Sequence, residues 1–85
     1  MQKGEMKKTI KYGFVRIYIW ENRVMKDGKE VIIPCISVNR IYMDMRTKQL
    51  KHVNHFREGD LENLNKALMD VAIYFAELEG QRMEQ

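Results

Sequence analysis

The sequence has one cysteine, one proline and two histidines among its 85 residues. A lone Cys35 cannot form an internal disulfide, and so few cysteines and histidines exclude a disulfide-stapled scaffold or a Cys-rich zinc module. No apolar stretch approaches the roughly 18 residues of a membrane span, and residues 1–11 lack the apolar centre of a secretory signal. These absences predict a cytoplasmic protein that needs no membrane, metal or cofactor.

Catalytic motifs are equally scarce. The five glycines are scattered, so no glycine-rich loop is available to cradle a phosphate. His52 and His55 are three residues apart, and on a strand such side chains point to opposite faces and cannot share a metal ion. Cys35 has no recognisable base to activate it and is expected to be a small buried hydrophobe. We therefore predict a protein that is not an enzyme.

The overall composition is that of a folded domain, with 45% hydrophobic and 32% charged residues. A chain of this length buries only roughly 60–65% of its unfolded surface, so its core is thin and help from a partner chain is plausible. We expect a single domain over residues 12–80, preceded by a flexible basic arm or weak edge strand at residues 1–11 and followed by a tail at residues 81–85.

Charge is divided unevenly along the chain. Residues 1–57 hold 13 lysines and arginines against 5 acidic residues, whereas residues 58–85 hold 2 against 7. A field of this kind attracts polyanions to one part of a molecule and repels them from another. The alternative is that the asymmetry serves only solubility.

Alternation predicts an antiparallel meander at the start of the domain. In residues 12–20 the odd positions Val15, Ile17 and Ile19 are aliphatic and the even positions carry rings and an arginine, as expected of a strand with two different faces. Asp27 and Gly28 suit a tight hairpin turn. Residues 31–43 form a second strand, with an edge or bulge expected at Pro34 because proline cannot donate to a ladder. Residues 44–48 are a polar turn, and residues 49–56 a short third strand.

From Leu61 the apolar period becomes helical, and it ends near Gly80. Arg57 is one candidate for the N-cap, with Phe56 and Leu61 as a hydrophobic staple, and Asp60 is the other. The stripe expected to face the sheet consists of Leu61, Leu64, Leu68, Val71, Phe75 and Leu78. A second apolar stripe lies beside it and predicts a homodimer joined through the helices, unless the arm or a loop of the same chain covers it; this stripe consists of Met69, Ala72, Ile73 and Ala76.

The even-numbered face of the first strand is the strongest functional signal. Unpaired nucleic acid offers exposed bases and a flexible phosphate chain, so its binders combine flat rings with cations. If a helix covers the aliphatic face, the rings are left to solvent, where a ligand would explain them. The alternative is that this face is the core or a sheet-to-sheet interface. The residues predicted to bind single-stranded nucleic acid are Tyr12, Phe14, Arg16, Tyr18 and Trp20, with Arg40, Arg46, Lys48, Lys51 and His52 along the phosphate chain.

Three stretches give the chain a family resemblance: residues 17–22 (IYIWEN), residues 37–44 (SVNRIYMD) and residues 56–61 (FREGDL). With strands first and one long amphipathic helix last, the chain resembles the positive-cofactor-four type of transcriptional coactivators and their bacterial and phage relatives. The resemblance implies a homodimer that binds single-stranded DNA through curved sheets, and it implies binding roles for Trp20, Arg40 and Tyr42. It also implies four strands, with residues 7–10 the only room for the fourth.

The runner-up function is a small protein-interaction module that uses the helix and the aromatic sheet face for protein contacts. Both hypotheses share one fold prediction, an α+β domain with an antiparallel sheet of three to four strands followed by one C-terminal helix.

Overall fold

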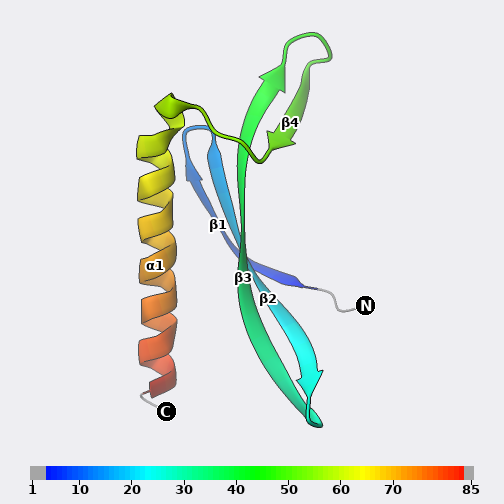
Figure 1. The fold of residues 1–85 in the computed structure, drawn as a ribbon, viewed down its shortest axis with the longest axis vertical. Coiled ribbons are helices and arrows are strands. Elements are labelled where there is room, and N and C mark those ends of the chain that lie inside the picture. Colours follow the sequence, from blue (N-terminus) through cyan, green and yellow to red (C-terminus); the bar gives the residue numbers. More distant parts are fainter. Residues whose placement is uncertain (1–3, 84–85) are drawn as a thin grey trace.

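Four antiparallel strands followed by one helix make up the α+β fold of the computed structural model, which describes residues 4–83 (Figure 1). The strands are β1 (Glu5–Tyr12), β2 (Val15–Lys26), β3 (Lys29–Asp44) and β4 (Gln49–Val53), and they neighbour one another in chain order. A 3₁₀ turn, η1 (Glu58–Asp60), leads directly into α1 (Leu61–Met83). The predicted meander and C-terminal helix are confirmed, with four strands.

The two faces of β2 are distributed as the alternation predicts. Val15, Ile17 and Ile19 are at most 1% exposed and form the centre of the core. Ile10 from β1 and Ala67 and Val71 from α1 complete the buried cluster, so α1 covers this face of the sheet. The opposite face has no second layer among the described elements (Figure 1), and we refer to it as the open face.

Two hairpin turns lie where the sequence predicts them. Lys26 pairs with Lys29, and the two residues between them, Asp27 and Gly28, have φ of 53° and 77°. Positive φ at both central positions is the type I′ geometry for which Asp-Gly is favoured. At residues 45–48 the chain turns again, with the Lys48 N–H donating to the Asp44 carbonyl at 2.7 Å. The polar turn predicted there is confirmed.

The N-terminal segment is an edge strand. β1 pairs with β2 from Glu5 to Tyr12, while residues 1–3 of the predicted arm lie outside the described part. The register shifts between Met6 and Lys8, so this sheet has its bulge in β1. Pairing of β3 with β2 is regular through Pro34, so the edge or bulge predicted there is present as an edge without a bulge. The predicted edge is correct, because β4 pairs with β3 only from Arg40 to Asp44.

The helix is placed correctly, but its buried face is rotated from the predicted one. Leu61 and Leu68 are 57% and 41% exposed, whereas Ala67 is fully buried at the centre of the contact. A small alanine lets the helix backbone approach the sheet, so the contact follows Ala67 and Val71 and leaves two of the leucines outside it. The helix also continues through Gly80 to Met83, so residues 81–83 of the predicted tail are helical.

The molecule is elongated, with extents of 50 × 29 × 16 Å. Its radius of gyration is 16.0 Å, against about 12 Å for a compact domain of this length. Beyond the Glu5–Glu21 pair the β2–β3 hairpin is a two-stranded ribbon (Figure 1). Such ribbons are marginally stable alone in water, which agrees with the thin core predicted from chain length.

Candidate nucleic-acid interface

The open face presents an aromatic and basic strip along β2. Arg16, Tyr18 and Trp20 alternate with the buried aliphatic residues and therefore lie on the face away from α1. Each of the three is partly exposed. Residues two apart on a strand are about 6.6 Å apart, so the two rings form neighbouring platforms. This part of the predicted site is arranged as the sequence indicates.

Two cations stand opposite each other at one end of this strip. Lys11 on β1 pairs directly with Arg16 on β2, so both side chains occupy the open face. The Arg16 guanidinium is anchored through Nη1 to the carbonyl oxygens of Gly13 (2.7 Å) and Val15 (2.9 Å). Like charges directly opposite each other on a sheet are destabilising. An anion bound between them would relieve this repulsion.

Trp20 is the most restricted of these side chains. Gly4 packs beside it, because a Cβ added at Gly4 would lie 3.6 Å from Trp20 Cε3 and would overlap the Asn22 side chain. Cys35, half-buried and opposite Trp20 on β3, accepts a hydrogen bond from Asn22 Nδ2 at 3.2 Å. Trp20 Nε1 is buried, and it has no acceptor among the described residues. One side of the indole is thus packed while its N–H is left without a partner.

Two of the predicted aromatic residues do not belong to the open face. Tyr12 ends β1 and pairs with Val15, which places it on the helix side, where its hydroxyl donates to Asp70 Oδ2 at 2.5 Å. This hydrogen bond raises the pKa of Tyr12, with burial adding to the effect. Phe14 is in the β1–β2 turn and is 55% exposed, beneath the Arg40 guanidinium at 5.0 Å.

Gly13 is the reason that Tyr12 and Phe14 lie off the open face. Its φ of +56° starts the two-residue turn, and a Cβ at this position would overlap the Asn63 side-chain amide of α1. Residues 12–20 are therefore two strands joined by a turn, and the single strand predicted there is wrong. Because the turn inverts the alternation, Tyr12 shares a face with the aliphatic residues of β2.

Arg40 is held on the helix side by an internal ion pair. Its Nε donates to Asp60 Oδ2 at 2.6 Å, and the two side chains are only 12% and 7% exposed. The same carboxylate oxygen accepts the backbone N–H of Arg57 at 2.9 Å, which makes Arg57 the N-cap of η1. This backbone hydrogen bond is the first cause of the lowered pKa of Asp60. Burial opposes it, whereas the hydrogen bond of Arg40 and the charges of Arg40 and Arg57 add to the lowering.

A pocket of about 330 Å³ lies beside this ion pair, between the β3–β4 hairpin and the segment that leads to η1. We call it the basic pocket; it is lined by Arg40, Tyr42, Val53, His55 and Arg57. Lys51 pairs with Tyr42 across β3 and β4 and shares its face. Arg40, Tyr42 and Lys51 were among the predicted residues, and the structure brings them together on the side opposite Trp20.

His55 and Arg57 were missed as site residues. Both lie in a non-periodic connection, residues 54–57, where no pattern shows which side chains converge. The one available signal was local: the connection adds a histidine and an arginine to a basic strand. Only the path of the chain from β4 to η1 brings them beside Arg40.

The remaining predicted cations lie in the β3–β4 turn or at the β4 edge of the open face. Arg46 and Lys48 occupy the β3–β4 turn, where the Arg46 side chain is 93% exposed and Lys48 has a positive φ of 58°. His52 pairs with Ile41, so it points to the open face at the β4 edge. The structure therefore divides the predicted set between two faces and one turn.

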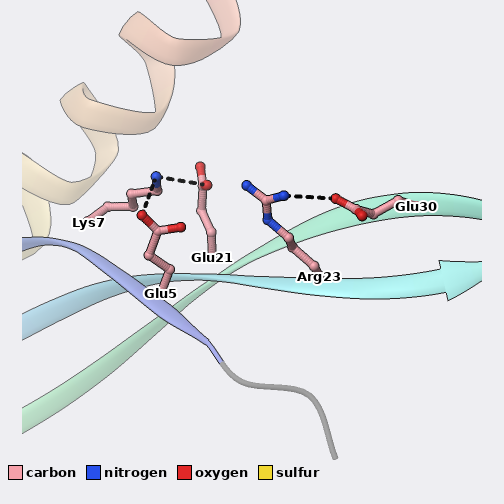
Figure 2. Close-up of polar contacts among 5 residues, drawn as sticks. All are labelled: Glu5, Lys7, Glu21, Arg23 and Glu30. Carbon is pink, nitrogen blue, oxygen red and sulfur yellow. Dashed lines mark hydrogen bonds and ion pairs between the residues drawn. The ribbon is translucent and has the colours of Figure 1, made fainter.

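The helix side of the β2–β3 ribbon carries charges that neutralise one another. Figure 2 shows Lys7 between Glu5 (3.1 Å) and Glu21 (3.6 Å), and Arg23 bonded to Glu30 at 3.1 Å. The Glu5 hydrogen bond is the first cause of the raised pKa of Lys7. With three carboxylates and two cations, this region does not attract a polyanion.

The second helix stripe is uncovered in the single chain. Met69 and Ile73 are 62% and 53% exposed, and Ala72 and Ala76 are also exposed. The alternative that the arm or a loop of the same chain covers them is therefore wrong for the described residues.

Within residues 4–83, no three His, Cys, Asp or Glu side chains are grouped as metal ligands would be. The described part of α1 is too polar to be a membrane-crossing helix. Comparisons of the chain with protein-family models, curated proteins and solved structures give no match.

Proposed function

We propose that this protein binds single-stranded nucleic acid on the open face of its sheet, without catalysis. The observation that carries the proposal is the position of Tyr18, Trp20 and Arg16 on the sheet face that no helix covers. Each ring can stack on an unpaired base, and stacking contributes about 1–3 kcal/mol per base. The opposed Lys11 and Arg16 supply the cations for the phosphate chain.

An unpaired strand fits this surface better than a duplex does. Stacking on a ring requires an exposed base face, and the bases of a duplex are already stacked on each other. The resemblance to the positive-cofactor-four type favours DNA over RNA and assigns binding to Trp20.

The proposed binding form is a two-fold dimer. The exposed stripe on α1 is apolar and lies opposite the helix contact with the sheet, so a second copy can cover it with the same stripe. The elongated shape, with six buried apolar residues among those that the structure describes, leaves the single chain with little core of its own. Burying Met69 and Ile73 between helices would add to that core.

A titration with oligo-dT at low salt, followed by quenching of Trp20 fluorescence, tests the function. Binding should weaken linearly in a plot of log K against log salt, with a slope near −0.7 for each phosphate neutralised. Absence of quenching and of binding at low salt would remove the proposal. A salt-independent signal would contradict the role of the cations.

The second candidate is a protein-interaction module, and the β2–β3 ribbon is the observation that favours it. The β2–β3 hairpin leaves apolar side chains at least 37% exposed on both of its faces: Val31 and Ile33 on the open face, and Met25, Ile32 and Ile36 on the helix side. Exposed apolar side chains of this kind can contact protein partners. Pull-downs with single-stranded DNA, with duplex DNA and from nuclease-treated extract separate the two functions. A protein partner would still be captured after nuclease treatment, and the single strand would not bind.

A further inference from the structure

The basic pocket is a concave site that the sheet separates from the open face. Its lining combines two guanidinium groups, an imidazole and a phenol ring, with Val53 as the apolar wall. Polar groups in a concave site fix the orientation of a ligand, and guanidinium groups can bind an anionic one.

Arg40 is fixed before any ligand arrives. Its Nε is bonded to Asp60 and its guanidinium lies over the Phe14 ring, so both its position and its plane are held. An arginine has five N–H donors, and this ion pair uses one. The Nη donors have no acceptor among the described residues and remain available on the pocket side. A side chain that is already ordered loses little entropy on binding.

Arg57 supplies a positive charge that forms no ion pair among the described residues, although it acts on the Asp60 carboxylate at longer range. Asp60 holds its backbone through two hydrogen bonds of 2.9 Å, one in each direction, while the Arg57 side chain has no ion pair within the described part of the chain. Asp60 thus positions both arginines and is itself neutralised by Arg40. The nearby carboxylate of Asp44 accepts the Arg46 backbone N–H at 3.0 Å and belongs to the β3–β4 turn. The pocket therefore keeps a net positive charge.

The Tyr42 ring in the pocket lining indicates which class of ligand can bind. Tyr42 is 37% exposed and Lys51 stands beside it on β4, so a flat group can lie on the ring with a cation at its edge. The planar guanidinium group of an arginine can donate to two oxygens of one phosphate, and the pocket contains two such groups. The volume of about 330 Å³ is near the lower end of the range of roughly 300–1,000 Å³ for ligand pockets. A pocket of this size suits a single small molecule and not a nucleic-acid strand.

We propose that the basic pocket binds a nucleoside phosphate, with the phosphate on Arg40 and Arg57 and the base on Tyr42. This goes beyond the proposed function, because the site lies on the other face of the sheet and binds a single nucleotide. The ligand can come from two sources, a free nucleotide or the 5′-phosphorylated end of a strand. A phosphorylated peptide is the competing class, and it would need only the arginines.

Isothermal titration of the full chain with AMP, adenosine, inorganic phosphate and phosphotyrosine tests the site. AMP should bind at least about tenfold more tightly than adenosine or phosphate alone, because it uses both the ring and the cations. Arg57→Gln should weaken AMP binding at least tenfold, whereas Arg46→Gln, which removes the same charge from an exposed turn, should change it less than twofold. Tyr42→Ala should weaken AMP and leave inorganic phosphate unchanged.

Several results would overturn the inference. Equal losses in Arg57→Gln and Arg46→Gln would indicate general charge attraction, and phosphotyrosine binding without AMP binding would indicate a phosphopeptide site. A 5′-phosphorylated oligo-dT that binds more tightly than its 5′-hydroxyl form, with the difference lost in Arg57→Gln, would support the pocket and identify the strand end as the source. If neither AMP nor the 5′-phosphate is recognised, the pocket proposal fails. The open-face function is judged separately, because quenching of Trp20 by 5′-hydroxyl oligo-dT should persist in Arg57→Gln.

Discussion

Replacement of Trp20 tests the open face most directly. If the indole stacks on one base, Trp20→Ala removes about 1–3 kcal/mol of binding free energy, which is a loss of affinity of roughly 5- to 150-fold. Because the substitution also removes the fluorophore, binding is best measured by the anisotropy of a labelled oligo-dT. Phe14→Ala is the matched control: this ring is 55% exposed but lies in the β1–β2 turn, off the open face. Its effect should stay below about threefold.

Stability must be measured on the same variants, since Trp20 is also half-buried. Trp20→Phe is informative because it keeps a ring and removes the buried Nε1–H, which has no acceptor in the described chain. An unsatisfied buried donor costs about 1–3 kcal/mol, so this variant should unfold in urea with a free energy within about 1 kcal/mol of the parent, or higher. Unchanged oligo-dT affinity in Trp20→Ala would refute the stacking role. Complete unfolding of Trp20→Ala would instead favour the alternative hypothesis that this face belongs to the hydrophobic core.

Three further predictions concern the fold and the assembly. Ile73→Glu should convert a dimer to monomers in sedimentation velocity, and an unchanged profile would rule out the helix interface. Ile17→Ala, at a fully buried position, should cost about 2–5 kcal/mol of unfolding free energy, whereas Ile32→Ala on the exposed ribbon should cost below about 1 kcal/mol; similar losses would contradict the assigned core. The lowered pKa of Asp60 means that its ionised form stabilises the fold above the unfolded pKa of about 4, and that this stability is lost as the pH falls through the folded value. Asp60→Asn should lose this acid dependence in urea denaturation, and an unchanged pH profile would contradict the ion pair.

Local patterns predicted those features that depend on neighbours in the chain. The alternation of Val15, Ile17 and Ile19 identified the buried face, because a strand cannot place successive residues on the same side. Asp27-Gly28 identified a turn through its tolerance of positive φ. The fourth strand was less visible, although Ile10 and Val15 have opposite parity, and such a change of phase is what a two-residue turn at Gly13 produces.

Features that depend on the path of the chain could not be predicted. Asp60 was considered only as a helix cap, but its carboxylate also binds Arg40, twenty residues earlier, and this pair organises the basic pocket. The rotation of α1 has the same origin. Leucine spacing marks an apolar stripe, whereas the closest approach to the sheet is decided by the small side chain of Ala67.

The charge division along the chain has a counterpart in space. The four described strands lie within the basic part of the chain, residues 1–57, and η1 and α1 lie within the acidic part, residues 58–85, with exposed side chains that include Glu62 and Glu77. On the helix side, the charged side chains of the β2–β3 ribbon already form ion pairs (Figure 2). The helix therefore repels a polyanion. Cations of the sheet side that form no ion pair among the described residues attract one, at places that include Lys11 with Arg16 on the open face and Arg57 in the basic pocket. Because the sheet separates these places, one strand can occupy the open face while its end, or a free nucleotide, occupies the pocket without competition.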